Sequence, residues 1–328
     1  MLNRKCQTPL LMLFCALVIS LTTSVRSQDT PVEKKYGEKP GLLILAHGAP
    51  TPRWAEAIAT IADKVRELNA EKKVFHAVTG SMMEFAQPDA VAGIETLEQA
   101  GCDRIIVVPI FICPTSHTHF DVPAVLGLYS SPSVRRTLQS ENARVATPRV
   151  PVTMTQTISE GDLLARYLSD ELATLSTNSD EEALVLISHG DAGHAGLIDR
   201  IMKRLMDVAT EKSGITTVEN VYCGVGQTYA RDVIPVVQKL GKDKKKVIVV
   251  GFYLVSSAKS IGDMGSRMRG MGRGPGMGRG NSAPAAENTP PAPVADPYEG
   301  IDVLFSEKGV IEHPYTPQWI LECATEAL

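Results

Sequence analysis

An internal repeat constrains the fold of this chain more than any other feature of its sequence. The heptapeptide LLILAHG at residues 42–48 recurs as LVLISHG at residues 184–190, which pairs His47 with His189 at an offset of 142 residues. Two further matches hold at the same offset: Ile105–Val108 with Val247–Val250, and Asp121 with Asp263. Since three separate places agree without a gap, we predict that the chain contains a duplicated domain.

Both halves alternate short apolar runs with stretches of helical periodicity. In the first half we predict strands at 42–46, 74–79, 104–112 and 143–149, and helices at 53–69, from Pro88 to Gly101, and at 158–175. In the second half we predict strands at 183–188, 217–223, 246–254 and 301–305, and helices at 195–212, 228–240 and 316–327. Near-continuous apolar strands that alternate with helices are typical of parallel sheets. The predicted fold class is therefore α/β, with two tandem doubly wound parallel-sheet lobes.

The N-terminal segment has the pattern of an export signal. Arg4 and Lys5 precede an apolar run at 10–21 that is shorter than a membrane span, so we expect cleavage near Gln28 and a periplasmic location. An uncleaved N-terminal anchor is the alternative. The predicted domains then follow in order: a signal peptide at 1–27, a tether at 28–40, a first lobe with the metal site at 41–157, and a second, degenerate lobe at 158–328.

One stretch of the second lobe has a composition that cannot build a core. Residues 262–298 are rich in glycine, methionine and arginine, and then in proline and alanine. Such a segment buries too little apolar surface to order itself, so we predict a disordered insertion there.

Charge and cysteine usage exclude two classes of protein. The formal net charge of −4 over 328 residues argues against a nucleic-acid binder. Four cysteines remain after the predicted signal, without C-x-x-C spacing, which does not support a zinc knuckle: Cys102, Cys113, Cys223 and Cys323. We interpret them as small buried apolar residues, although an oxidising compartment permits a disulfide. The sequence leaves their pairing and the oligomeric state open.

Metal-binding side chains follow three of the predicted strands. His47 comes directly after the first strand, Glu84 follows the second, and His117 and His119 follow the strand at 104–112. The carboxyl ends of parallel strands meet at one edge of a sheet, so we expect these groups to converge. Imidazole and carboxylate ligands suit a borderline divalent ion such as cobalt, nickel, iron or zinc. A histidine is also a fitting proton acceptor near neutral pH.

Four motifs of the first half together resemble those of a known family. They are the strand that ends in His47-Gly48, the hexapeptide MEFAQP at 83–88, the pentapeptide VPIFI at 108–112, and His117-x-x-x-Asp121-Val122-Pro123. This combination resembles the CbiX and SirB sirohydrochlorin chelatases, which are class II chelatases, in a two-repeat long form. The resemblance implies a lyase-type, ATP-independent enzyme that inserts Co²⁺, or Fe²⁺ or Ni²⁺, into sirohydrochlorin or a related tetrapyrrole.

The same resemblance assigns roles to individual residues. It implies that His47 and His117 bind the metal and accept protons and that Glu84 supports them, whereas His119 lies outside the family pattern. In the second half the offset pairs His117 with Lys259, which does not bind metal while protonated, so we expect one metal centre per chain. We predict that Lys259, His189 and His119 contact the substrate, Lys259 through carboxylates of the tetrapyrrole. Packing or hydrogen bonding at the lobe interface is the alternative for His189.

Export leaves a second hypothesis open, because tetrapyrrole synthesis is normally cytoplasmic. The alternative is an exported protein that carries metal or haem on a chelatase scaffold. In either case the expected partner is a tetrapyrrole. We expect no nucleic-acid partner, and membrane contact only through an uncleaved signal.

Overall fold

The computed structural model describes residues 38–224, 227–263 and 296–328. Residues 37–328 belong to one compact unit. The predicted signal peptide, almost all of the predicted tether and most of the predicted insertion lie outside the described residues. Among the helices that are described, none has the length and apolar character needed to cross a membrane.

The first half folds into a parallel four-stranded sheet with the order β2-β1-β3-β4. Its strands are β1 (Pro40–Ala46), β2 (Ala77–Met82), β3 (Arg104–Pro109) and β4 (Val152–Met154). Central β1 pairs on both sides, with Leu42 opposite Val78 of β2 and Ile106 of β3. Residues Leu42 to Ala46 are completely buried, as expected for a strand that helices cover on both faces.

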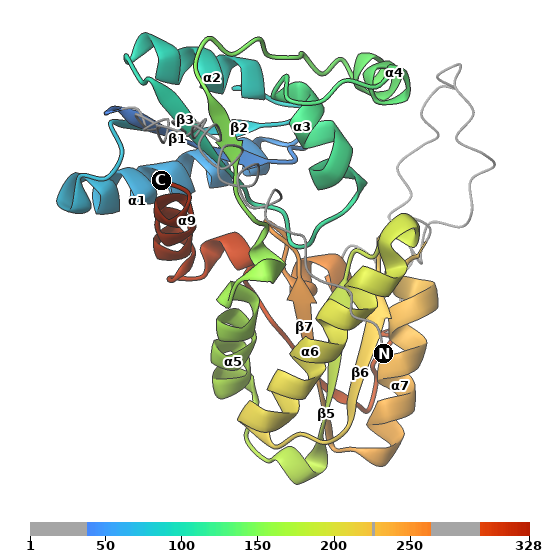
Figure 1. Cartoon of the computed structure of the whole chain (residues 1–328). Coiled ribbons are helices and arrows are strands. Elements are labelled where there is room, and N and C mark those ends of the chain that lie inside the picture. Colours follow the sequence, from blue (N-terminus) through green and yellow to red (C-terminus); the bar gives the residue numbers. More distant parts are fainter. Residues whose placement is uncertain (1–37, 225–226, 264–295) are drawn as a thin grey trace, which may run out of the picture. The chain divides into compact units, whose positions relative to one another are not determined.

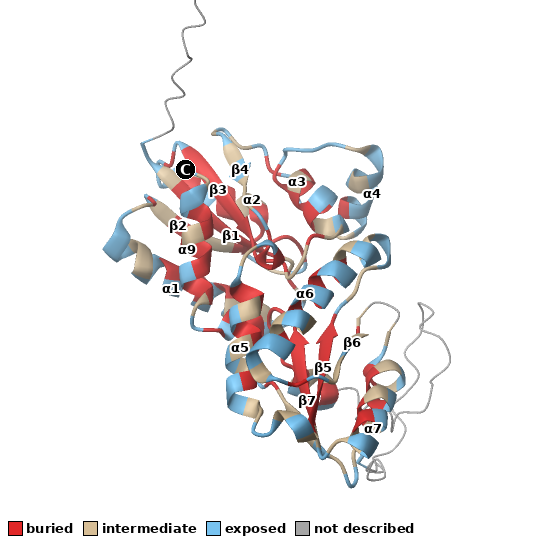
Figure 2. Ribbon diagram, turned by 60° about the horizontal axis from the view of Figure 1, so that its bottom comes forward, coloured by how far each residue is buried: buried red, intermediate tan, exposed pale blue. Residues whose placement is uncertain are grey.

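The second half forms another parallel sheet, with the order β6-β5-β7-β8. Its strands are β5 (Glu182–Ser188), β6 (Val218–Tyr222), β7 (Lys246–Phe252) and β8 (Asp302–Phe305). The two sheets share one strand order and have buried central strands (Figure 2). The α/β class with two parallel-sheet lobes is therefore confirmed, while the exact offset of the duplication stays a prediction.

Helices connect the strands and cover the sheets (Figure 1). They are α1 (Pro52–Lys72), α2 (Ala90–Gln99), α3 (Val122–Val125), α4 (Pro132–Ser140), α5 (Leu163–Leu175), α6 (Ala195–Ser213), α7 (Ile234–Asp243) and α9 (Thr316–Glu326). Local signals explain several of their ends. Asp89 caps α2 by accepting a hydrogen bond from the Ala92 N–H at 2.9 Å, and Gly214 ends α6 in the left-handed conformation (φ 77°).

The last helix, α9, packs against the sheet of the first half. We expected the helix at 316–327 to close the second lobe, but α9 packs against α1 and β3 of the first sheet, whereas α5 packs against α6 and β7 of the second. At its end, Arg104 of β3 donates hydrogen bonds to the carbonyls of Ala327 and Leu328. On α5, the Tyr167 hydroxyl donates to the Gly251 carbonyl in β7 at 3.1 Å. The division of the chain at residue 158 stays a prediction.

Two strand predictions were wrong for local reasons. Residues 143–149 form no strand; Pro148 and Pro151 lack backbone N–H donors in this region, and the strand beside β3 is β4. The strand predicted at 74–79 begins only at Ala77. The Asn69 side chain holds both backbone groups of Phe75 at 2.8 Å, which keeps that residue in a turn.

The described residues reach into both ends of the insertion predicted at 262–298. Gly262 is the buried end of a helical turn against Tyr229. At the other end, Tyr298 packs its ring 6.0 Å from that of Phe305 and donates from its hydroxyl to Tyr229 at 2.7 Å. One aromatic anchor in a Pro/Ala-rich stretch is enough to order its neighbours, and composition alone does not reveal it.

Candidate functional site

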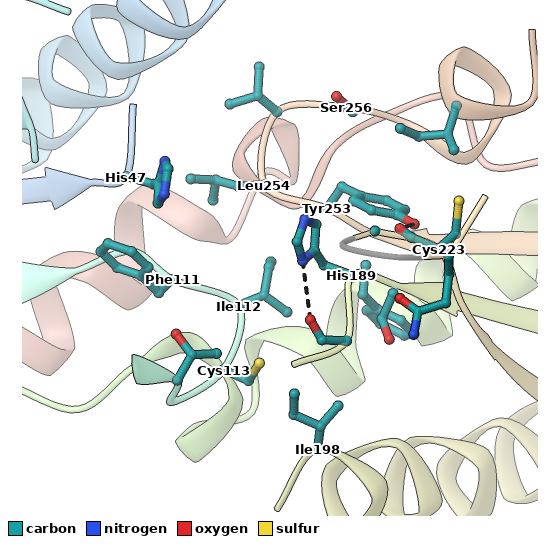
Figure 3. Close-up of a pocket in the computed structure, with 18 of the residues that line it drawn as sticks. His47, Phe111, Ile112, Cys113, His189, Ile198, Cys223, Tyr253, Leu254 and Ser256 are labelled. Atoms are coloured by element: carbon teal, nitrogen blue, oxygen red, sulfur yellow. Dashed lines mark hydrogen bonds between the residues drawn. The ribbon is translucent and has the colours of Figure 1, made fainter. Parts of the chain in front are cut away.

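The carboxyl ends of the strands in both halves open onto one cavity of about 1070 Å³. His47 follows β1, the segment 110–113 follows β3, His189 follows β5, and the segment 252–256 ends and follows β7; all of them line this cavity. Figure 3 shows His47 beside Phe111, with Ile112 and Leu254 between His47 and His189. The strand-edge argument from sequence therefore holds for both halves of the chain.

His47 is held by oxygen atoms at both of its ring nitrogens. Its Nε2 lies 2.9 Å from Oε1 of Glu84, and its Nδ1 lies 2.8 Å from the carbonyl oxygen of Gly48. A ring nitrogen that faces an oxygen acceptor carries a proton, so this arrangement holds the ring in its charged form. Burial lowers the pKa of His47, but the bonds to Glu84 and Gly48 outweigh it and raise that pKa above its ordinary value.

The backbone around His47 fixes Glu84 beside it. The Glu84 N–H donates to the His47 carbonyl at 3.0 Å, which continues the pairing of β1 and β2 beyond the sheet. Gly48 has φ +99°, and a Cβ there would lie 2.1 Å from the Glu84 carbonyl oxygen. A side chain at position 48 would therefore push the two strand ends apart. The Glu84 carboxylate is buried, yet its bond to His47 holds its pKa below the ordinary value against the opposing effect of burial.

His117 lies next to His47, with its ring oriented by a carboxylate. The two ring centroids are 4.7 Å apart at 80°. Nδ1 of His117 lies 2.8 Å from Oδ2 of buried Asp121, one turn further along a π-type helical turn. An Nδ1–H donated to Asp121 leaves the Nε2 lone pair available, which is the usual arrangement of a metal-binding histidine. Sequence analysis missed this role of Asp121, although the i,i+4 spacing was a signal for it.

A third acid completes the cluster and was not predicted. Glu141 follows α4, and its side chain is hydrogen-bonded to that of Glu84. The Oε2 atoms of both glutamates are buried and have no donor among the described residues, which disfavours the charged form of one carboxyl beside the other. Burial and the neighbouring Glu84 raise the pKa of Glu141 to about 7. No sequence pattern connects these positions, because α4 itself was not predicted.

The three predicted substrate contacts lie in different places. His189 lines the cavity, and its Nδ1 faces the Gly190 carbonyl at 3.2 Å. Lys259 is not among the lining residues; its exposed Nζ contacts Glu307 at 2.7 Å. His119 is also absent from the lining, and its ring stacks on that of His194. The structure therefore brings only His189 of the three to the cavity, and its contact with substrate stays a prediction.

Most of the cavity wall is apolar. Six of its larger apolar side chains are Trp54, Phe111, Ile198, Met202, Phe252 and Leu254. Among the described lining residues Arg231 is the one lysine or arginine, and Asp232 pairs with it at 2.9 Å. Cys113 and Cys223 also line the cavity, and the four cysteines of the described residues are free thiols. Such a wall suits a flat, largely hydrocarbon ligand.

The histidine cluster is open rather than closed around an ion. In the part of the chain that the structure describes, no group of three or more His, Cys, Asp or Glu side chains is arranged to hold a metal. Two imidazoles with open positions bind an ion that a second ligand can take over, unlike a closed four-cysteine site. His47 must first lose its Nε2 proton, so metal and proton compete for this ring.

Solved chelatase structures match this fold. SirB from Bacillus subtilis with Fe³⁺ matches with a TM-score of 0.59 and 13% identity, over 88% of this chain and 95% of that one. The CbiX described as the terminal enzyme for siroheme biosynthesis in denitrifying bacteria matches with a TM-score of 0.51 and 15% identity, over 88% and 99%. At this identity the likeness concerns the fold alone, which is that of a two-lobed class II chelatase.

Sequence comparison identifies the family. The CbiX family profile matches residues 41–175. Sirohydrochlorin cobaltochelatase of Methanosarcina barkeri is 32% identical over 91 residues, 28% of this chain and 67% of that protein. The Methanococcus maripaludis and Methanocaldococcus jannaschii proteins of the same name are 32% and 36% identical over 88 and 87 residues, 27% and 26% of this chain. This chain covers only 58% of the length of those two. The chain belongs to the CbiX family.

Proposed function

We propose that this chain is an ATP-independent metal chelatase that inserts a divalent ion into sirohydrochlorin or a related tetrapyrrole. The observation that carries the proposal is the contact of His47 and His117, with ring centroids 4.7 Å apart, at the edge of a large apolar cavity. Cobalt is the first candidate ion, because the relatives are named cobaltochelatases; Fe²⁺ and Ni²⁺ are the alternatives.

The two histidines have different parts in the proposed reaction. His117 offers Nε2 to the incoming ion, because Asp121 occupies Nδ1. His47 releases its Nε2 proton to bind the same ion. Glu84 stabilises the positive charge beside it, first that of the protonated ring and then that of the metal ion. As the four macrocycle nitrogens take over the ion, two of them each lose a proton. The ring nitrogens of His47 and His117, vacated by the metal, are the nearest acceptors for these protons.

The macrocycle would lie with its plane against the apolar wall. Burying a carboxylate without a cationic partner costs on the order of several kcal/mol. In the described lining, Arg231 is the one lysine or arginine. The substrate's carboxylates would therefore face the open side of the cavity. Among related tetrapyrroles, this lining favours those with fewer carboxylates.

An insertion assay tests the proposal directly. Full-length chain is mixed with sirohydrochlorin and Co²⁺, and the change in absorbance of the macrocycle is followed. A rate above the spontaneous one that is lost in His117→Ala, and kept in a control variant at an exposed histidine outside the cavity, His76→Ala, supports the enzyme. A rate equal to the spontaneous reaction at every protein concentration would refute it.

The second candidate is an exported carrier of metal or haem on the same scaffold. The apolar cavity favours this reading as well, because haem carries few carboxylates. Stoichiometric retention of the macrocycle without turnover would support the carrier over the enzyme. In both cases we propose, from residues 1–27, that the chain is exported to the periplasm; recovery of an intact N-terminus in the cytoplasm would contradict this.

A further inference from the structure

A second pair of histidines meets outside the cavity. Nδ1 of His119 lies 3.3 Å from Nε2 of His194, and the rings stack with centroids 5.2 Å apart at 22°. His119 belongs to the π-type turn at His117–Asp121 in the first half, whereas His194 ends a short 3₁₀ turn that follows β5 in the second half. The contact therefore joins two loops that are 75 residues apart in sequence.

A carboxylate lies near the other ring nitrogen of His194, Nδ1, which is buried and makes no hydrogen bond within the described residues. Oδ2 of Asp191 lies 3.4 Å from Nδ1 of His194, and Oδ1 of Asp191 accepts the Gly193 N–H at 2.8 Å. The Asp191 carboxylate is thus fixed by its own turn and leaves Nε2 of His194 directed at His119. A small shift of the ring would let an Nδ1–H donate to this carboxylate, which is the usual arrangement around a metal-bound histidine.

The spacing of the two nitrogens fits one metal ion. Two ligands of a tetrahedral ion at metal–nitrogen distances of about 2.05 Å lie roughly 3.3 Å apart, which is the separation of Nδ1 in His119 and Nε2 in His194. We propose that His119 and His194, buttressed by Asp191, form a second binding site for a borderline divalent ion such as Co²⁺, Ni²⁺ or Zn²⁺. Water completes the coordination, because His119 is exposed and His194 partly so.

This site is separate from the proposed catalytic one. His119 and His194 do not line the cavity, and neither is a ligand in the proposed insertion reaction. The site holds an ion two residues from His117, where it raises the local supply of metal at the cavity edge. Because it rests on its own geometry, it stands even if the chain proves to be a carrier rather than an enzyme.

Calorimetric titration with Ni²⁺ alone tests the site on the full-length chain. A His47→Ala/His117→Ala variant removes the cavity ligands, and we expect it to retain one bound ion per chain. Adding His119→Gln or His194→Gln to that variant should abolish this binding, whereas adding His76→Ala, at an exposed histidine on another surface, should leave it intact. Asp191→Asn should weaken binding about tenfold, the usual effect of losing an orienting partner.

The opposite results have clear meanings. If the His47→Ala/His117→Ala variant binds no Ni²⁺, or if His119→Gln and His194→Gln leave its affinity unchanged, the proposal is wrong and the contact is an N–H···N hydrogen bond only. Far-ultraviolet circular dichroism of each variant separates loss of the site from loss of the fold. Failure of the insertion assay has no bearing on this titration, so the two proposals are tested independently.

Discussion

Nδ1 of His117 lies 2.8 Å from Oδ2 of Asp121, across one turn of a π-type helix. The pair gives a physical meaning to the H-x-x-x-D motif, because four residues bring the carboxylate under the ring. Asp121 is buried. The geometry therefore fixes which nitrogen of His117 is free.

Replacing this carboxylate should impair metal insertion without unfolding the protein. In Asp121→Asn the amide can donate to Nδ1, which places the proton of His117 on Nε2 and blocks the metal. We expect the affinity for Co²⁺ and the insertion rate to fall about 10- to 100-fold. Initial rates and calorimetry measure the effect, with the exposed Glu95→Gln as a control; equal values for Asp121→Asn and the control would contradict the orienting role.

The bond between His47 and Glu84 should set the acid limb of the pH–rate profile. The pKa of His47 is raised because its bonds to Glu84 and Gly48 outweigh burial, so insertion should fall as the pH drops through this raised value. In Glu84→Gln the carboxylate charge is lost and burial prevails. We expect the midpoint of the acid limb to move to lower pH, along with a lower maximal rate. Initial rates measured between about pH 5 and pH 9 give this midpoint. An unmoved midpoint in Glu84→Gln would contradict the assignment of the acid limb to His47.

The apolar cavity wall predicts an order of affinities. Uroporphyrin, coproporphyrin and mesoporphyrin carry progressively fewer carboxylates, and we expect the dissociation constant to fall along this series. The reason is that the described lining supplies Arg231 as its one lysine or arginine. Trp54 lines the cavity, so quenching of its fluorescence measures binding. A Trp319→Phe variant removes the fluorescence background of the other tryptophan. Tightest binding of uroporphyrin would overturn the interpretation of the wall.

Glu182 should make the stability of the second half dependent on pH. Its buried carboxylate accepts hydrogen bonds from Ser176, Thr177 and Asn178 and pairs with Lys246 at 3.3 Å. Although burial opposes ionisation, these bonds lower the pKa of Glu182 from 4.5 to about 2. A lowered folded-state pKa gives stability that is fully present above pH 4.5 and is lost as the pH falls toward 2.

The matching variant is Glu182→Gln. At pH 7 it should lower the free energy of unfolding by about 3 kcal/mol, and the difference from the parent should shrink as the pH approaches the folded-state pKa. Urea denaturation at several pH values measures this difference. Glu219→Gln, at an exposed position on neighbouring β6, is the control; a difference for Glu182→Gln that does not depend on pH would disprove the explanation.

The convergence of His47, Glu84 and His117 could be predicted because it depends on local patterns. Each residue follows an apolar strand, and parallel strands of one sheet bring their carboxyl ends to the same edge. The order of the elements followed from hydrophobic periodicity in the same way. The strand predicted at 143–149 failed because an apolar count did not weigh the prolines at 148 and 151.

Other parts of the site depend on how distant segments pack. Glu141 reaches Glu84 only because α4 and its following turn lie over the first sheet, and His119 meets His194 only because loops of the two halves come together. The sequence spacing of these residues predicts neither contact. The position of α9 is likewise decided by packing, because this helix buries its apolar face against α1 and β3.

The sequence by itself determined most of the strands, which of their ends carry histidines, and that the chain has two similar halves. Only the tertiary structure decided that both halves supply walls to one apolar cavity, and that Glu141, an acid outside the motifs, joins the histidine cluster. The reason is physical: periodicity and turn chemistry act over a few residues, whereas the partner of a buried face or of a charged group is chosen by the packing of whole elements.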